Sequence, residues 1–154
     1  MTIELEGEAL PSEKVPDLGQ SGVEPIEGAG ATPVELRLSA WNDDTGALRM
    51  GVNGHAYPDA ELIRATVGET QRWTVVNEME WDHPSHLHGF FFQRADASGA
   101  PIEPVEWLDT INVPRSASEH FLIRYDNRPG LWMAHCHILD HSDAGMMTMV
   151  DLAR

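Results

Sequence analysis

Two short segments of the sequence hold most of the side chains that could bind a metal ion. The segment HCHILDHSDAGM, residues 135–146, contains the only cysteine of the chain. The segment WDHPSHLHGFFF, residues 81–92, contains three more histidines. Together the two segments hold six of the eight histidines in the protein. This concentration of imidazole and thiol groups indicates metal chemistry.

If each segment includes a β-strand, the spacing of its ligands divides them between two faces. Side chains alternate along a strand, so His135 and His137 point one way and Cys136 points the other. His86 and His88 likewise share a face. Pro84 is more typical of a strand edge or a turn than of a continuous ladder, which lets His83 point away from that pair. One strand can therefore serve two different sites.

The side of Cys136 gathers the ligands of a mononuclear copper site. Cys136, His141 and His83 supply a thiolate and two imidazoles, and Met146 supplies a thioether as a weak axial ligand, which is the blue-copper set. Zinc would accept the cysteine and the histidines, but a zinc site gives no role to the methionine or to a second set of histidines. We expect the nearby Met147 and Met149 to fill the core instead.

The elements that must position these side chains are short strands. Apolar and polar side chains alternate from Val34 onward, and no amphipathic helix of three turns is apparent. Eight further segments are rich in Val, Ile, Thr and aromatic residues and are separated by turn signals such as Asn53-Gly54. These segments are residues 48–52, 62–67, 71–77, 89–94, 107–113, 120–125, 131–138 and 147–152. Short strands at this spacing predict an all-β, two-sheet antiparallel sandwich.

The composition changes along the chain. Residues 1–33 are acidic and interrupted by proline and glycine, which predicts an irregular N-terminal arm or linker. Residues 34–154 are then one domain, which is long enough to bury a substantial core.

The charge and the hydropathy of the chain exclude several classes of partner. With 10 basic against 25 acidic residues, the net charge of −15 opposes binding to nucleic acid or to an anionic membrane. No segment approaches the ~20 apolar residues of a membrane span, and the first residues lack the basic and apolar regions of a signal peptide. A single cysteine forms no internal disulfide, so cysteine usage indicates no compartment.

The segments HPSHLHG and HCHILDHSDAGM resemble the two C-terminal copper motifs of the multicopper oxidases, the laccase-type family, and especially of its bacterial members. The similarity extends from about Val67 through WLDTINVPR and RPGLWMAHCHI to the C-terminus, and more loosely back to Val34. It implies a cupredoxin-like Greek-key β-sandwich with copper as the cofactor. It also implies an oxidoreductase that takes electrons from a phenol, an aromatic amine or a metal ion and reduces O2 to water.

The resemblance assigns a role to each ligand. The four residues that match the type 1 copper ligands, where electrons enter, are His83, Cys136, His141 and Met146. The four that match the histidines given to a trinuclear (type 2/type 3) copper cluster are His86, His88, His135 and His137. Because Cys136 is covalently flanked by His135 and His137, this tripeptide matches the family's electron route between the two sites.

The chain holds half of the histidines that the family's cluster requires. The cluster takes eight, four of them from His-x-His motifs of an N-terminal domain, and here only His55 and His120 remain outside the two segments. Three hypotheses follow. Another chain or a missing N-terminal cupredoxin domain completes the cluster, a homo-oligomer binds copper between its subunits, or the protein is a stand-alone blue-copper electron carrier that leaves the four histidines empty.

Two aspartates next to these motifs have two interpretations each. Asp82 precedes His83, and Asp109 lies in the WLDT segment. Either carboxylate could orient a metal-binding histidine, since such imidazoles usually donate their second N–H to a carboxylate or a carbonyl. The interpretation that we favour for both is a solvated surface group.

Overall fold

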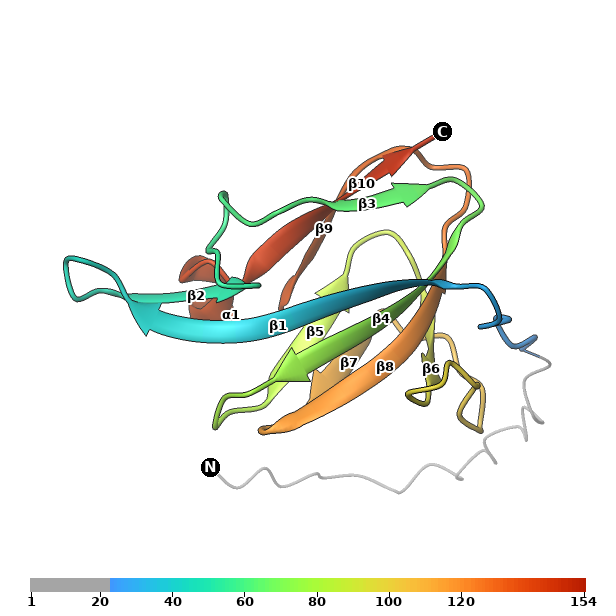
Figure 1. The fold of residues 1–154 in the computed structure, drawn as a ribbon, viewed down its shortest axis with the longest axis horizontal. Coiled ribbons are helices and arrows are strands. Elements are labelled where there is room, and N and C mark those ends of the chain that lie inside the picture. The colour runs from blue at the N-terminus through green and yellow to red at the C-terminus, as the bar shows by residue number, and fades with distance from the viewer. Residues whose placement is uncertain (1–22) are drawn as a thin grey trace, which may run out of the picture.

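The computed structural model describes residues 23–154, which form two facing β-sheets (Figure 1). The first sheet contains, in spatial order, β2 (Leu48–Val52), β1 (Thr32–Asn42), β4 (Thr70–Asn77), β8 (Ala117–Arg124) and β6 (Phe92–Ala95). The second contains β3 (Ile63–Thr66), β10 (Met147–Ala153), β9 (Gly130–Cys136), β5 (His83–Leu87) and β7 (Thr110–Val113). The predicted two-sheet sandwich is confirmed.

Both sheets are mixed, although the expectation was an antiparallel sandwich. The pairs β1–β4 and β3–β10 are parallel, and the remaining neighbours are antiparallel. A parallel pair requires a crossover connection. Between β1 and β4 the chain passes through β3, which belongs to the opposite sheet. Alternation of apolar residues predicts which face of a strand is buried, but it carries no information on strand direction.

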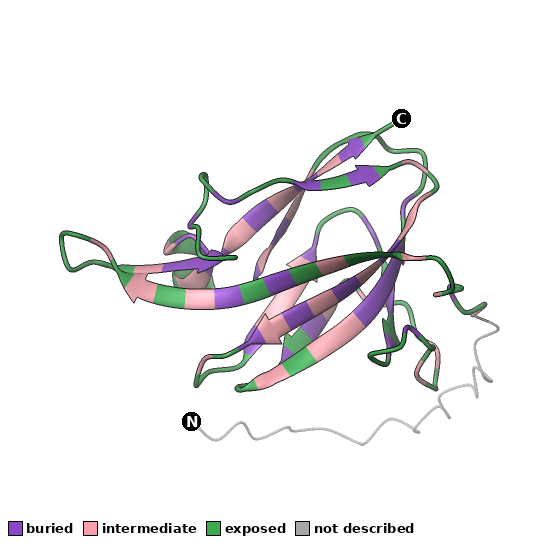
Figure 2. Ribbon diagram, in the orientation of Figure 1, coloured by how far each residue is buried: buried purple, intermediate pink, exposed green. Residues whose placement is uncertain are grey.

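The core fills the space between the sheets, as the alternating buried and exposed positions along the strands show (Figure 2). Trp73 on β4 packs against Phe121 on β8, with ring centroids 5.7 Å apart. Phe92 on β6 stacks on Phe121 at 4.2 Å. Gln71 is buried beneath them and accepts hydrogen bonds from the Trp73 indole and the Tyr125 hydroxyl, at 2.9 and 3.0 Å. The buried side chains of Gln71, Trp73 and Tyr125 are thus paired with one another, as buried polar groups generally are.

Strand β5 was not among the predicted strand ranges. Pro84 suggested a strand edge or a turn, yet His83–Leu87 form a strand between β7 and β9. Proline lacks the donor of a sheet ladder, but the carbonyl of Pro84 still accepts the backbone N–H of His137 at 2.7 Å. This strand carries the predicted ligands His83 and His86, and it lies next to β9, which carries His135 and Cys136.

The predicted arm is described only in part, because residues 1–22 lie outside the described residues. Residues 23–31 contain no strand or helix. Ile26 is buried against Leu122 on the outer face of the first sheet, and its N–H donates to Oε1 of Gln93 at 2.6 Å. The last residues of the arm therefore pack on the sandwich.

The structure has one short helix within residues 23–154, α1 (Leu139–Asp143). It follows β9 directly and carries His141. No helix in this part of the chain is long and apolar enough to span a membrane.

Candidate metal centres

Three of the predicted ligands converge between the two sheets, and we call them, with Met146, the inner group. Sγ of Cys136 at the end of β9 lies 3.6 Å from Nδ1 of His83 and 3.6 Å from Nδ1 of His141. The two Nδ1 atoms are 3.1 Å apart. His83 and Cys136 are buried and His141 is partly exposed. Such separations suit one ion bonded to all three atoms, since metal–nitrogen and metal–sulfur bonds measure about 2.0–2.3 Å.

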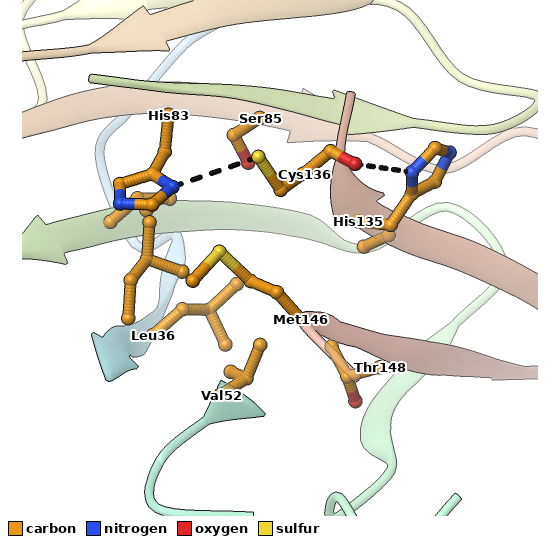
Figure 3. A pocket seen from close by; sticks show the side chains of 11 residues that line it. Leu36, Val52, His83, Ser85, His135, Cys136, Met146 and Thr148 are labelled. Carbon is orange, nitrogen blue, oxygen red and sulfur yellow. Dashed lines mark hydrogen bonds between the residues drawn. The ribbon is translucent and has the colours of Figure 1, made fainter. Parts of the chain in front are cut away.

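Met146 lies beside this group. It is fully buried and, together with Cys136 and His83, lines a cavity of about 10 Å³ (Figure 3). The rest of the wall is mainly aliphatic. The loop after β9 folds back because Met146 donates its N–H to His141 and accepts the N–H of Cys136, at 3.0 and 3.1 Å. The cavity has room for one atom or one water molecule and for nothing larger.

The other two methionines are placed differently from the prediction. Thr148 and Val150 point into the core, so Met147 and Met149 face the outer side of the second sheet and are only half-buried. Met147 lies opposite His135 in the register of β9 and β10. The prediction that both fill the core is wrong, because β10 is a two-faced strand whose outer face is uncovered in the described chain.

The protonation of the inner group makes it a neutral pocket in the absence of a metal. Burial lowers the pKa of His83 to about 4, assisted by the neighbouring His141 and opposed by Asp82. Burial also raises the pKa of the Cys136 thiol. Two neutral imidazoles and a soft sulfur, enclosed by apolar walls, fit a soft cation that displaces the thiol proton when it binds. The residues present therefore fit copper.

A second set of histidines lies on the outer face of the second sheet, and we call it the outer group. The metal-binding atoms of His86, His88 and His135 all lie within 4.8 Å of one another, with Nε2 of His88 only 3.0 Å from Nε2 of His135. The ring of His137 adjoins them, with centroids 5.1 Å from His86 and 5.6 Å from His135. All four predicted cluster histidines therefore meet on one face, opposite to Cys136.

The register of the strands explains this meeting. His86 on β5 lies directly opposite His135 on β9, and Ser85 lies opposite Cys136. Directly opposed residues of an antiparallel pair share a face. Burial of the outer group lowers the pKa of His135, and the neighbouring His88 and His137 lower it further, while its hydrogen bond to the carbonyl of Cys136 opposes this. The imidazole of His135 is therefore favoured in its neutral form, which can bind a metal.

The two remaining histidines belong to neither of the metal-binding groups found in residues 23–154. Nδ1 of His120 lies 3.0 Å from the hydroxyl of Thr74 on the first sheet, and His55 is exposed in a turn after β2. Asp82 accepts hydrogen bonds from Asn112 and from the backbone N–H of Arg115, which lower the pKa of its carboxyl. It is therefore a surface group that closes a loop.

The sequence model of the multicopper oxidase family matches residues 30–153. The chain belongs to this family. It is similar to the multicopper oxidase MmcO of Mycobacterium tuberculosis, with 33% identity over 100 residues that cover 65% of this chain and 19% of that protein. A laccase of Bacillus subtilis is 28% identical over 137 residues, which cover 76% of this chain and 27% of the laccase. The crystal structure of the multicopper oxidase McoA from Aquifex aeolicus has a TM-score of 0.75 at 25% identity, covering 87% of this chain and 32% of that chain.

This multicopper oxidase chain thus spans about a fifth to a third of the length of these relatives. The family, the cupredoxin-like fold and copper as the cofactor are confirmed. The assignment of individual ligands stays a prediction, which the geometry of the two groups supports.

The low pKa of His83 predicts a loss of stability in acid for the metal-free protein. The unfolded chain binds a proton at His83 below pH 6.5, whereas the folded chain does so only near pH 4. The contribution of neutral His83 to the free energy of unfolding should therefore be fully present above pH 6.5. It should be lost as the pH drops from 6.5 to 4, which lowers the free energy of unfolding by on the order of 3 kcal/mol. Urea titrations across this range measure the effect.

The variants should be compared by how their free energy of unfolding changes with pH. Its absolute value is not informative, because any substitution at a buried site destabilises the fold. A His83→Gln variant should lose this part of the pH dependence, and a His120→Gln variant should keep it. The same slope in the parent and in the His83→Gln variant would contradict the assignment.

Proposed function

We propose that this domain binds a type 1 copper through the inner group and gives the outer group to a trinuclear copper cluster. The observation that carries the proposal is the position of Cys136. Its side chain belongs to the inner group, and its covalent neighbours His135 and His137 belong to the outer group on the opposite face of β9. Bound copper would supply one-electron transfer from a reducing donor and the reduction of O2 to water. The tripeptide supplies the covalent path between the two centres.

The exposed edge of His141 is the proposed entry point for electrons. The ring of Trp81 lies 6.3 Å from the ring of His141 and is 55% exposed. The amide of the buried Asn77 donates to the carbonyl of Trp81 at 2.7 Å, which fixes the loop that carries this indole. An exposed indole beside a ligand favours aromatic donors, namely phenols or aromatic amines, over metal ions.

The outer group requires a partner to complete a cluster of the family's composition. Four histidines stand on this face, together with the half-buried Met133, Met147 and Met149 and with Leu131, which is 60% exposed. A partly apolar face that carries unfilled ligands is typical of an interface. We propose that a second cupredoxin domain, or further copies of this chain in a homo-oligomer, covers it and supplies the missing histidines.

Copper content per chain, measured together with solution mass, tests this function. More than one copper per chain in an assembly larger than a monomer, together with oxygen consumption in the presence of an aromatic amine, is the expected result. One copper per chain in a blue monomer that consumes no oxygen would instead identify an electron carrier. Colourless protein after copper loading would exclude the type 1 site.

A further inference from the structure

The imidazole of His86 is held from the side that faces away from the other histidines. His86 lies in the middle of a row across the second sheet, with His135 opposite it on β9 and Thr110 opposite it on β7. One side of its ring therefore faces the outer group, and the other side faces the edge strand β7.

The contacts on the β7 side are both to hydrogen-bond acceptors. Nδ1 of His86 lies 2.9 Å from the backbone carbonyl of Asp109 and 2.9 Å from Oγ1 of Thr110. A carbonyl oxygen can only accept. The hydroxyl of Thr110 donates its proton to the carboxylate of Asp109 at 2.9 Å, so its oxygen is left to accept from His86.

These contacts decide which nitrogen of His86 carries the hydrogen. A neutral imidazole has one N–H and one lone pair, and the partner of the N–H selects the tautomer. Because Nδ1 faces two acceptors, it must be the N–H, and the lone pair is then on Nε2. The Asp109 carboxylate itself is 3.8 Å from Nδ1 and is 54% exposed, so it acts on His86 through Thr110 and not by direct contact.

We infer that Thr110 is a positioning residue for His86: with its hydroxyl oriented by Asp109, it fixes the Nδ1–H tautomer and directs the Nε2 lone pair toward the outer group. The inference deepens the proposed function, and its relevance to copper rests on that function. The tautomer itself is a property of the metal-free protein. Loss of such a supporting contact typically weakens metal binding by about 10–100-fold.

The first test measures the tautomer directly. Long-range proton–nitrogen NMR spectra of the metal-free full chain report which nitrogen of each histidine is protonated. His86 should be in the Nδ1–H form in the parent. In a Thr110→Val variant the Nε2–H form should gain population because one of the two acceptors is gone, and a Thr110→Ser variant should restore the parent spectrum.

The chain offers a matched control for this substitution. Thr74 and His120 form the same kind of cross-strand pair, with Oγ1 3.0 Å from Nδ1, on the other sheet. A Thr74→Val variant should change the signals of His120 and leave those of His86 unaltered. An Nε2–H tautomer of His86 in the parent, or an unchanged His86 in the Thr110→Val variant, would overturn the inference.

The second test measures metal binding. Copper(II) titrated into chains whose type 1 site is already filled should bind to the outer group about tenfold more weakly in Thr110→Val than in the parent or in Thr110→Ser, with the blue absorption unchanged. Equal affinity in Thr110→Val and the parent would overturn a role for Thr110 in copper binding. Failure of the parent to turn blue would refute the proposed function, and the tautomer measurement would still decide the role of Thr110.

Discussion

Copper-loaded protein with Cys136 replaced by serine should lose its blue colour completely. The intense absorption of a blue-copper site requires the thiolate–copper bond, and a serine hydroxyl is a hard donor that does not deprotonate at neutral pH. Visible absorption and electron paramagnetic resonance spectra of the parent and of the Cys136→Ser variant measure the effect. Because serine is close in size to cysteine, the buried position at the end of β9 should remain filled.

A second variant in the inner group, Met146→Leu, distinguishes the effect of losing the thiolate from the effect of losing another member of the group. Met146 would give the proposed set its thioether, and a weak thioether ligand tunes the reduction potential without creating the colour. A Met146→Leu variant should therefore stay blue with a shifted potential. Blue absorption that survives in Cys136→Ser would refute the type 1 assignment.

Replacement of both His86 and His88 by alanine should remove every copper beyond the first from each chain. Both side chains lie on the outer face, where His88 is exposed and His86 half-buried, so their truncation opens no cavity in the core. The blue absorption should be unchanged because the inner group lies on the opposite face of the sheet. Copper content by atomic absorption, normalised to the blue absorption, measures the loss.

The control for this double variant is His120→Ala. It removes an imidazole of similar exposure from the other sheet and should change neither the copper content nor the colour. If the double His86→Ala, His88→Ala variant retained all the copper of the parent, the outer group would not be the second copper site. Where the cluster forms between chains, the same variant should also shift the solution mass toward the monomer.

Much of the candidate site could be predicted from local sequence. The alternation of side chains along a strand is fixed by backbone geometry, so the order His135, Cys136, His137 is enough to place one sulfur and two imidazoles on opposite faces. His141 and Met146 can lie next to Cys136 because they follow it closely in the sequence, and the backbone N–H of Cys136 donates to the carbonyl of Met146. The structure brings His83, Cys136 and His141 together, and His141 lies on the short helix α1.

The wrong predictions share one origin. Local sequence patterns do not specify which strands pair or what covers each face of a sheet. Pro84 favoured a strand edge or a turn over a continuous ladder, yet tertiary pairing places β5 between β7 and β9. Met147 and Met149 were predicted in the core because they are apolar, but the face of β10 that is buried depends on what covers it. Thr110 carries no signal in the sequence beyond its position after Asp109, because its partner lies 24 residues away.

The sequence by itself thus determined the chemistry of this protein: the donor atoms, their division between two faces of one strand and the family to which they belong. Only the tertiary structure decided which donor atoms lie close enough to share a metal ion, which nitrogen of His86 faces the outer group and which face of the second sheet is left uncovered by residues 23–154. The physical reason is that alternation along a strand is a property of the covalent chain, whereas the register between β5, β7 and β9 is set by packing of the whole sandwich.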